Sequence, residues 1–182
     1  MKKTLLIFAI VLALSTVLWY WDKATRVKAT SSVKNTQQAE AKIDGKPAPE
    51  VKFKDLDGND VTLAQYKGTV VLVDFWATWC PPCRMAIPGL NELHRKYKDR
   101  GVSIVGISVD ENPKALVGFD RETHIEYVSL LTSEKAEKAF GSIVGLPSTF
   151  VLDRQGKVYK SYVGEVDRDE LESDLQALLA AR

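Results

Sequence analysis

The sequence predicts an α/β domain in which helices flank a mixed central sheet, and three observations lead to this prediction. Two runs, TVVLVDFW at 69–76 and VSIVGISVD at 102–110, are apolar or β-branched almost throughout, as expected of strands buried on both faces. A segment with helical character follows each run. The chain then ends in a strand–turn–strand pattern and a final helix over 167–181. Strands that alternate with helices indicate layers of helices packed on a sheet.

Shorter segments complete the predicted order of elements. Residues 51–63, VKFKDLDGNDVTL, are typical of an N-terminal β-hairpin with its turn at DGND. A helix is expected over 81–97, interrupted by Pro88, which has no amide hydrogen. A further helix is expected over 113–121, and a short strand over 126–131.

Two later helices have predictable ends. In the segment 133–141, Ser133 is a candidate N-cap and Gly141 a candidate for the residue just past the last turn. Asp167 and Glu170 resemble a capping box at the start of the last helix, although Ser or Thr is more usual in the first position. Between these helices, STFVLD and KVYKSYVG are expected to form a hairpin through the turn DRQG.

Residues 1–21 are predicted to be an N-terminal signal anchor, a transmembrane helix. The run from Leu5 to Trp21 is uncharged and would span about 25 Å as a helix. Aromatic residues close the run and favour the membrane–water interface. A cleaved signal peptide is the alternative, but WYWD follows the run in place of a small-residue cleavage site. Residues 22–46 lack periodicity and large apolar residues, which predicts a flexible linker before a domain at 47–182.

Charges beside the apolar run do not orient it by themselves. Lys2 and Lys3 precede the run, whereas four Lys or Arg residues follow it between positions 22 and 34. Counted simply, the positive-inside rule would hold the domain in the cytoplasm. Long domains translocate largely regardless of flanking charge, so this count does not exclude an exported domain.

The predicted domain is mildly acidic. The whole chain has a formal net charge of +1, and the positive excess lies before Pro47. A domain without a basic stripe argues against nucleic acid as a partner. We expect the domain to act as a monomer.

The chemistry is expected at the two cysteines of the chain, in WCPPCRMAIP at 79–88. Cys80 follows a predicted buried strand and begins a helix, and open α/β sheets place their sites beyond the carboxyl ends of strands. A helix N-terminus offers free amide donors and partial positive charge, which favour a thiolate. Cys83, one turn later, is within reach of Cys80 for a disulfide. Its more buried position would make it the resolving thiol.

Residues near the cysteines modify this chemistry. Pro81 and Pro82 have no amide N–H, so the Cys80 thiolate would keep mainly the Cys83 N–H as a donor. A less stabilised thiolate suggests a reducing protein, because the reduced form is then less favoured. Asp74 lies in a strand that should contain no charge, and burial of a carboxylate raises its pKa. We expect Asp74 to lie beneath the cysteines and shuttle the proton of Cys83; the alternative is that it caps a backbone group or reaches solvent.

The segment VVLVDFWATWCPPC resembles the active-site segment of thioredoxins, and residues 47–182 resemble the membrane-anchored TlpA/ResA-like branch of the thioredoxin superfamily. The resemblance implies a thioredoxin-like fold with an N-terminal hairpin and a βα insertion near 112–131. It implies thiol–disulfide exchange outside the cytoplasm (the periplasmic side), reduction of client disulfides, and no soluble cofactor. A membrane thiol–disulfide electron donor would recharge the Cys80–Cys83 pair, and cytochrome c maturation is a typical pathway of the family.

The resemblance also implies a client-binding surface. VGLPSTFVLD matches the segment that carries a cis proline in the family, which makes Pro147 the candidate. The backbone of Leu146 would then pair with an extended client. Trp79, Pro81 and Pro82 are expected to contact the client as well. Many members have a glutamate where this chain has Ala86, so the roles of that glutamate are not transferred.

Three other kinds of site are weighed against this interpretation. A zinc site needs about four ligands, and only two histidines without ligand spacing accompany the cysteines. A peroxiredoxin-like peroxidase needs Thr or Ser three positions before its reactive cysteine, where Cys80 has Ala77. A binding module with a structural disulfide would explain two cysteines in an exported protein. It would not explain their place at a helix start above Asp74.

Overall fold

The computed structural model describes residues 45–141 and 143–181. The predicted anchor at 1–21 and nearly all of the predicted linker at 22–46 lie outside the described residues. Within the described part, none of the helices combines the length and the hydropathy needed to span a bilayer.

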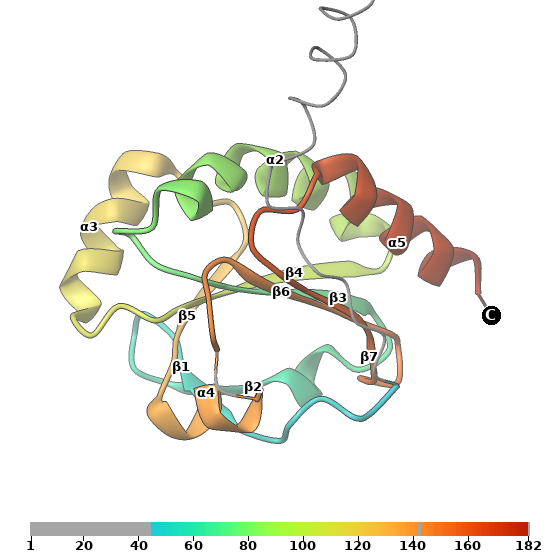
Figure 1. Ribbon diagram of the computed structural model, residues 1–182, viewed down its shortest axis with the longest axis horizontal. Coiled ribbons are helices and arrows are strands. Elements are labelled where there is room, and N and C mark those ends of the chain that lie inside the picture. Colours follow the sequence, from blue (N-terminus) through green and yellow to red (C-terminus); the bar gives the residue numbers. More distant parts are fainter. Residues whose placement is uncertain (1–44, 142, 182) are drawn as a thin grey trace, which may run out of the picture. The chain divides into compact units, whose positions relative to one another are not determined.

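The described residues contain a mixed sheet of seven strands in the order β2-β1-β5-β4-β3-β6-β7 (Figure 1). Strands β3, β4 and β5 are parallel, and the remaining neighbours are antiparallel. The strands are β1 (Lys52–Lys54), β2 (Asp60–Thr62), β3 (Val70–Trp76), β4 (Val102–Ser108), β5 (Val128–Leu131), β6 (Ser148–Leu152) and β7 (Val158–Val163).

Helices cover both faces of the sheet. One face carries α2 (Pro81–Tyr97), α3 (Pro113–Thr123) and α5 (Arg168–Ala180), and the other carries α4 (Glu134–Ala139) (Figure 1). Two short 3-10 helices, η1 (Leu63–Tyr66) and η2 (Lys98–Arg100), precede β3 and β4. This is the α/β fold that the sequence predicts, with the hairpin β1–β2 and with α3 and β5 in the predicted insertion at 112–131.

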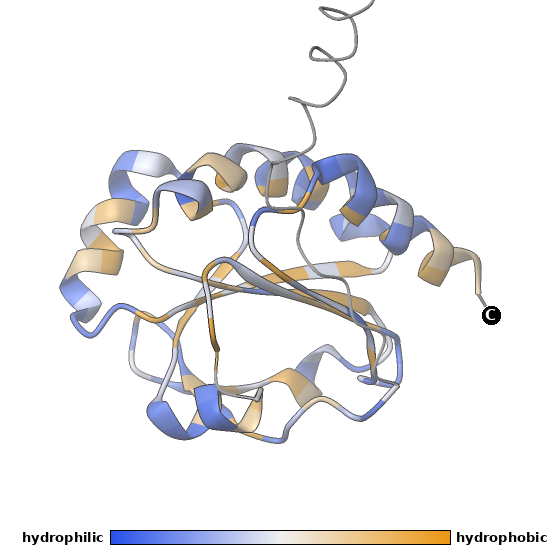
Figure 2. Cartoon of the chain, in the orientation of Figure 1, coloured by the Kyte–Doolittle hydropathy of each residue, from blue (hydrophilic) through white to orange (hydrophobic). Residues whose placement is uncertain are grey.

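The central strand β3 organises the core because all seven of its residues are buried. Val70 and Leu72 face α2 and α5, where they pack with Leu90 and Leu175 among others. Residues of the opposite parity in β3 pack toward η1 and α4 on the other face. Figure 2 shows the apolar strands between helices whose outer surfaces are hydrophilic. A continuous apolar run therefore marks a strand that is covered twice, as predicted.

Helix α2 is continuous through Pro88, so the predicted interruption there is wrong. Pro88 is exposed, and it removes only the one amide hydrogen that it lacks. On the buried side of the helix, Ile87, Leu90 and Leu93 keep both flanking turns packed on the sheet. Tertiary packing thus outweighs the local preference of proline.

The predicted helix ends are partly correct. The Ser133 side chain accepts a hydrogen bond from the Ala136 N–H, and Gly141 has a φ of 92°, as expected just past α4. Asp167 caps α5 by accepting from the Asp169 N–H. The capping box is wrong, however, because the Glu170 carboxylate instead accepts from Lys160 and Tyr162 of β7.

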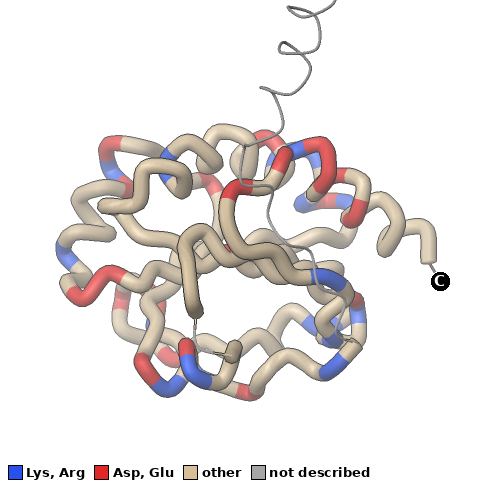
Figure 3. The backbone as a smooth tube through the Cα atoms, viewed as in Figure 1, with Lys and Arg blue, Asp and Glu red and all other residues tan. Residues whose placement is uncertain are grey.

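The described chain begins on the edge strand β7. The Gly45 N–H donates to the Val158 carbonyl, and the Val158 N–H donates to the Lys46 carbonyl. Hydrogen bonding to the sheet thus starts two residues before Pro47, the boundary expected from the sequence. Figure 3 shows acidic and basic residues side by side on the helices and turns around the sheet.

Candidate active site

The two cysteines lie where β3 passes into α2. Cys80 is the N-cap residue of α2, and its Sγ accepts from the Cys83 N–H at 3.4 Å. The two sulfurs are joined in a disulfide with an S–S distance of 2.06 Å and a Cα–Cα distance of 5.3 Å. Pro81 and Pro82 occupy the first helical positions, where a missing N–H disturbs no helical hydrogen bond. The sequence therefore starts the helix directly at the disulfide.

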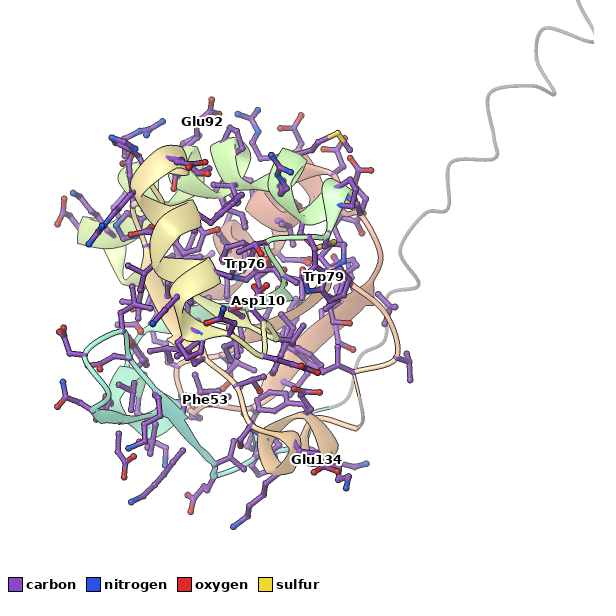
Figure 4. All side chains as sticks on the ribbon, turned by 90° about the vertical axis from the view of Figure 1, so that its left-hand side faces the viewer. Phe53, Trp76, Trp79, Glu92, Asp110 and Glu134 are labelled. Atoms are coloured by element: carbon purple, nitrogen blue, oxygen red, sulfur yellow. A yellow bond between two sulfur atoms is a disulfide. The ribbon has the colours of Figure 1, made fainter. Side chains whose placement is uncertain are left out.

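The disulfide is only slightly open to solvent. Cys80 is 4% exposed and Cys83 is 1% exposed. Trp79 beside them is 66% exposed, whereas Trp76, the last residue of β3, is buried. Figure 4 shows both tryptophans beneath α2, close to Asp110. Of the two, only Trp79 is open to a large partner.

Asp110 holds the turn that carries the cysteines, and the sequence analysis missed it. Its carboxylate accepts from the Thr78 N–H at 2.9 Å and from the Thr78 hydroxyl at 2.7 Å. It also accepts from the Ser108 hydroxyl at 2.7 Å. The available signal was an acid at the end of the buried run 102–110, at the sheet edge where the cysteines also lie.

Asp74 is buried in the middle of the sheet, on the face that α2 covers. It is 3% exposed, and its Oδ1 accepts from the Thr149 hydroxyl of β6 at 2.9 Å. Burial raises the pKa of Asp74 from 3.8 to about 7, and the Thr149 hydrogen bond lowers it only in part. Asp74 can therefore gain and lose a proton near neutral pH. Thr149 is a second residue that the sequence analysis did not identify.

A cleft opens beside Cys80, with a volume of about 480 Å³. Leu146 lies in its wall, and the Leu146–Pro147 peptide bond is cis. Among the described residues, neither the N–H nor the C=O of Leu146 takes part in a hydrogen bond. The cleft is lined mostly by apolar residues: Trp79, Cys80, Pro81, Pro82, Val109, Glu137, Ile143, Val144, Gly145 and Leu146.

The structure thus gathers most of the predicted site residues around one disulfide. The cleft is lined by Trp79, Cys80, both intervening prolines and Leu146. Cys83 is bonded to Cys80 behind it, and Asp74 lies within the sheet beneath α2. Ala86 is half-buried on α2 and brings no charge to this region. Among the described residues, no group of three or more His, Cys, Asp or Glu side chains could hold a metal ion.

A cysteine pair that closes at a helix N-terminus, on a sheet of this order, is the arrangement by which thioredoxin-like proteins exchange disulfides. Comparison with known proteins gives the family. The family described as Redoxin matches residues 43–179, and the chain belongs to it.

Individual relatives show which branch of the family the chain belongs to. The chain is 36% identical over 136 residues to "Thiol-disulfide oxidoreductase ResA" of Bacillus cereus, which covers 74% of this chain and 78% of the relative. It is 31% identical to "Thioredoxin-like protein YneN" of Bacillus subtilis, over 72% of this chain and 78% of the relative. A thiol:disulfide interchange protein of Chlorobium tepidum has a similar structure, with a TM-score of 0.68, 30% identity, and coverage of 76% of this chain and 99% of that chain. The protein is therefore a ResA-like thiol–disulfide oxidoreductase of the thioredoxin superfamily.

Proposed function

We propose that this protein reduces disulfides of client proteins outside the cytoplasm. The observation that carries this proposal is the placement of Cys80 at an exposed apolar cleft beside Leu146, whose backbone makes no hydrogen bond within the described residues. A small thiol needs no such cleft, whereas an extended polypeptide could place apolar side chains in it and pair with Leu146. Trp79, Pro81 and Pro82 border the same cleft and would contact the client.

The reaction follows from the geometry of the reduced pair. The Cys80 thiolate attacks one sulfur of the client disulfide, a mixed disulfide forms, and the other client sulfur leaves as a thiolate. Cys83 then attacks the Cys80 sulfur and releases the second client thiolate. Two electrons pass from the dithiol to the client, and the Cys80–Cys83 disulfide is left behind. Cys83 takes the second step because it lies inside the helix and is the less exposed sulfur.

Asp74 is the base for that second step. Cys83 must lose its proton before it can attack, and a carboxylate with a pKa of about 7 is matched to accept it near neutral pH. The proton would return to solvent after the client leaves.

The reducing direction rests on the small number of donors at Cys80. The Cys83 N–H is the only donor to the Cys80 sulfur among the described residues, since Pro81 and Pro82 have no amide hydrogen. A weakly stabilised thiolate favours transfer of electrons from the pair to a client.

Location and electron supply complete the proposal. The apolar run at 1–21 would anchor the protein as a single-pass membrane protein, with the catalytic domain on the extracytoplasmic side. A membrane thiol–disulfide carrier would reduce the pair again, and the protein would work as a monomer. Cytochrome c maturation is a typical pathway for ResA-like proteins, and we propose it as the pathway in which to look for clients first.

A charge placed in the cleft tests whether clients are proteins. Val144 lines the cleft and is 81% exposed, so Val144→Asp should fold normally. We expect kcat/KM for reduction of a protein disulfide to fall by about tenfold, because a carboxylate would be desolvated against apolar client residues. The rate with a small aromatic disulfide should stay within about twofold of the wild-type rate.

Val128→Asp is the matched control, because Val128 is also an exposed valine but lies in β5, outside the cleft. It should leave both rates unchanged. Equal losses for protein and small disulfides in Val144→Asp would mean that the cleft does not bind polypeptide, and the proposal would fail.

A further inference from the structure

A row of paired residues crosses the sheet at one level, and all of them except Gly106 have polar side chains. In the strand registers, Tyr162 pairs with Thr149, Thr149 with Asp74, Asp74 with Gly106, and Gly106 with Ser129. Side chains of directly paired residues point to the same face of a sheet. The row therefore lies on the face that α2, α3 and α5 cover, with Asp74 at its centre.

One half of the row is fully hydrogen-bonded. The Thr149 hydroxyl donates to Oδ1 of Asp74 at 2.9 Å. Farther along, the Tyr162 hydroxyl donates to Oδ2 of Asp174 at 2.5 Å. Every polar side chain on this side of Asp74 thus has a protein partner.

On the other side of Asp74, buried polar side chains lack hydrogen-bond partners within the described residues. Four buried side-chain polar atoms in the described part of the chain lack a hydrogen-bond partner, and three of them are Nε1 of Trp76, the hydroxyl of Tyr127 and the hydroxyl of Ser129. Ser129 is the row position next to Gly106. The aromatic rings of Trp76 and Tyr127 both lie against Gly106. Native structures leave few buried polar groups unpaired, and such a concentration calls for an explanation.

Gly106 brings these groups next to Asp74. A Cβ atom at Gly106 would lie 2.9 Å from Cε2 of Tyr127 and 3.0 Å from Nε1 of Trp76. Both rings therefore border the space that a side chain at this position would need. Because Gly106 is the ladder partner of Asp74, this space borders the carboxyl group. Oδ2 of Asp74 has no hydrogen bond within the described residues, so an acceptor is available there.

We propose that Trp76, Tyr127 and Ser129 form an internal water-binding site that links them to the Asp74 carboxyl group. Buried waters make about three hydrogen bonds to polar groups that would otherwise be unpaired. A water here would accept from the Trp76 N–H and from one hydroxyl, and would donate to the other hydroxyl and to Oδ2 of Asp74. All three unpaired groups and the free carboxyl oxygen are then satisfied together.

The site gives Asp74 a second polar neighbour on the side away from Thr149. The titratable groups that face this region are Asp74 in β3, Tyr127 before β5 and Asp120 in α3. The cysteines of α2 are joined in the disulfide. Tyr127 is influenced by the charges of both Asp74 and Asp120, and burial keeps its pKa well above 10, so its hydroxyl stays neutral. A neutral hydroxyl can pass a proton by accepting one and donating another. If Asp74 acts as the base proposed above, the water and Tyr127 provide its route toward α3; this consequence, unlike the water site, rests on the proposed function.

Two measurements on the full-length protein test the water site. The first is an NMR exchange experiment between the indole N–H of Trp76 and a long-lived internal water. We expect a direct contact in the wild type and its loss in Tyr127→Phe, which removes one hydroxyl and keeps the ring. No contact in the wild type would overturn the site.

The second measurement is a pH titration of Asp74, followed by the NMR chemical shift of its carboxyl carbon. In Tyr127→Phe the carboxylate loses a hydrogen-bonded water, so its pKa should rise by about half a pH unit or more. The matched control is Tyr97→Phe, which makes the same change in the same core cluster, where the hydroxyl instead donates to Glu172. Equal titrations in the two variants would overturn the link to Asp74. Neither readout uses a client or an electron donor, so failure of the proposed reductase activity would leave both interpretable.

Discussion

Cys83→Ser should trap clients on Cys80 as stable mixed disulfides. The variant keeps the attacking sulfur at the N-terminus of α2 but has no thiol to resolve the intermediate. Turnover should fall by more than about a thousandfold, because a hydroxyl cannot replace a thiolate in exchange. Non-reducing electrophoresis of cells that express the variant should show bands that disappear on reduction, and mass spectrometry of these bands would identify the clients.

Cys80→Ser is the control for this experiment. It should lose turnover equally and form no mixed disulfides, since Cys83 is 1% exposed and lies within the helix. Mixed disulfides on Cys83 in this variant, with none on Cys80 in the other, would reverse the roles assigned to the two cysteines.

Asp74→Asn should stabilise the protein above neutral pH and slow its exchange reaction. The native pKa of about 7 lies above the unfolded value of 3.8, so the folded state binds a proton that the unfolded state has lost. The free energy of unfolding of the wild type should therefore fall between about pH 4 and pH 7 and then level off. The full penalty is on the order of 4 kcal/mol, and the amide removes it.

Denaturant titrations of the oxidised protein at pH 4 and pH 8 would measure this difference. The variant should resemble the wild type at pH 4 and exceed it at pH 8, while disulfide reduction slows on the order of a hundredfold. Asp174→Asn is the matched control, because this buried carboxylate accepts hydrogen bonds from Tyr162 and Lys160. It should gain no stability at pH 8. A flat pH profile in the wild type would contradict the raised pKa of Asp74.

The parts of the fold that could be predicted are those that depend on residues close together in the sequence. The run at 69–76 is too apolar for an exposed strand, and Cys80 follows it after a turn too short to place the cysteines anywhere but the strand end. The same locality made Asp74 conspicuous, since a carboxyl group in such a run must be buried. The interruption at Pro88 was wrong because packing of the buried face of α2 holds the helix together across it.

The site residues that were not predicted from the sequence depend on partners far away in the chain. Thr149 contacts Asp74 across 75 positions, and Asp110 contacts Thr78 across 32. Glu170 fits a capping pattern locally, yet it bonds to β7, which the sequence places beside α5 only through the complete fold. Strand order and register decide these contacts, and neither can be predicted from a short segment of the sequence.

The proposed function requires that the Cys80–Cys83 pair donates electrons to clients. Its most direct test is the reduction potential of the full-length protein, measured by equilibration with dithiothreitol and read by tryptophan fluorescence and alkylation. A value near or below about −250 mV, on the thioredoxin side of the scale, is the predicted result. A value near about −120 mV would make the protein an oxidant and would contradict the proposed reductase function. It would also contradict the inference that the Cys80 thiolate is weakly stabilised because it has few hydrogen-bond donors.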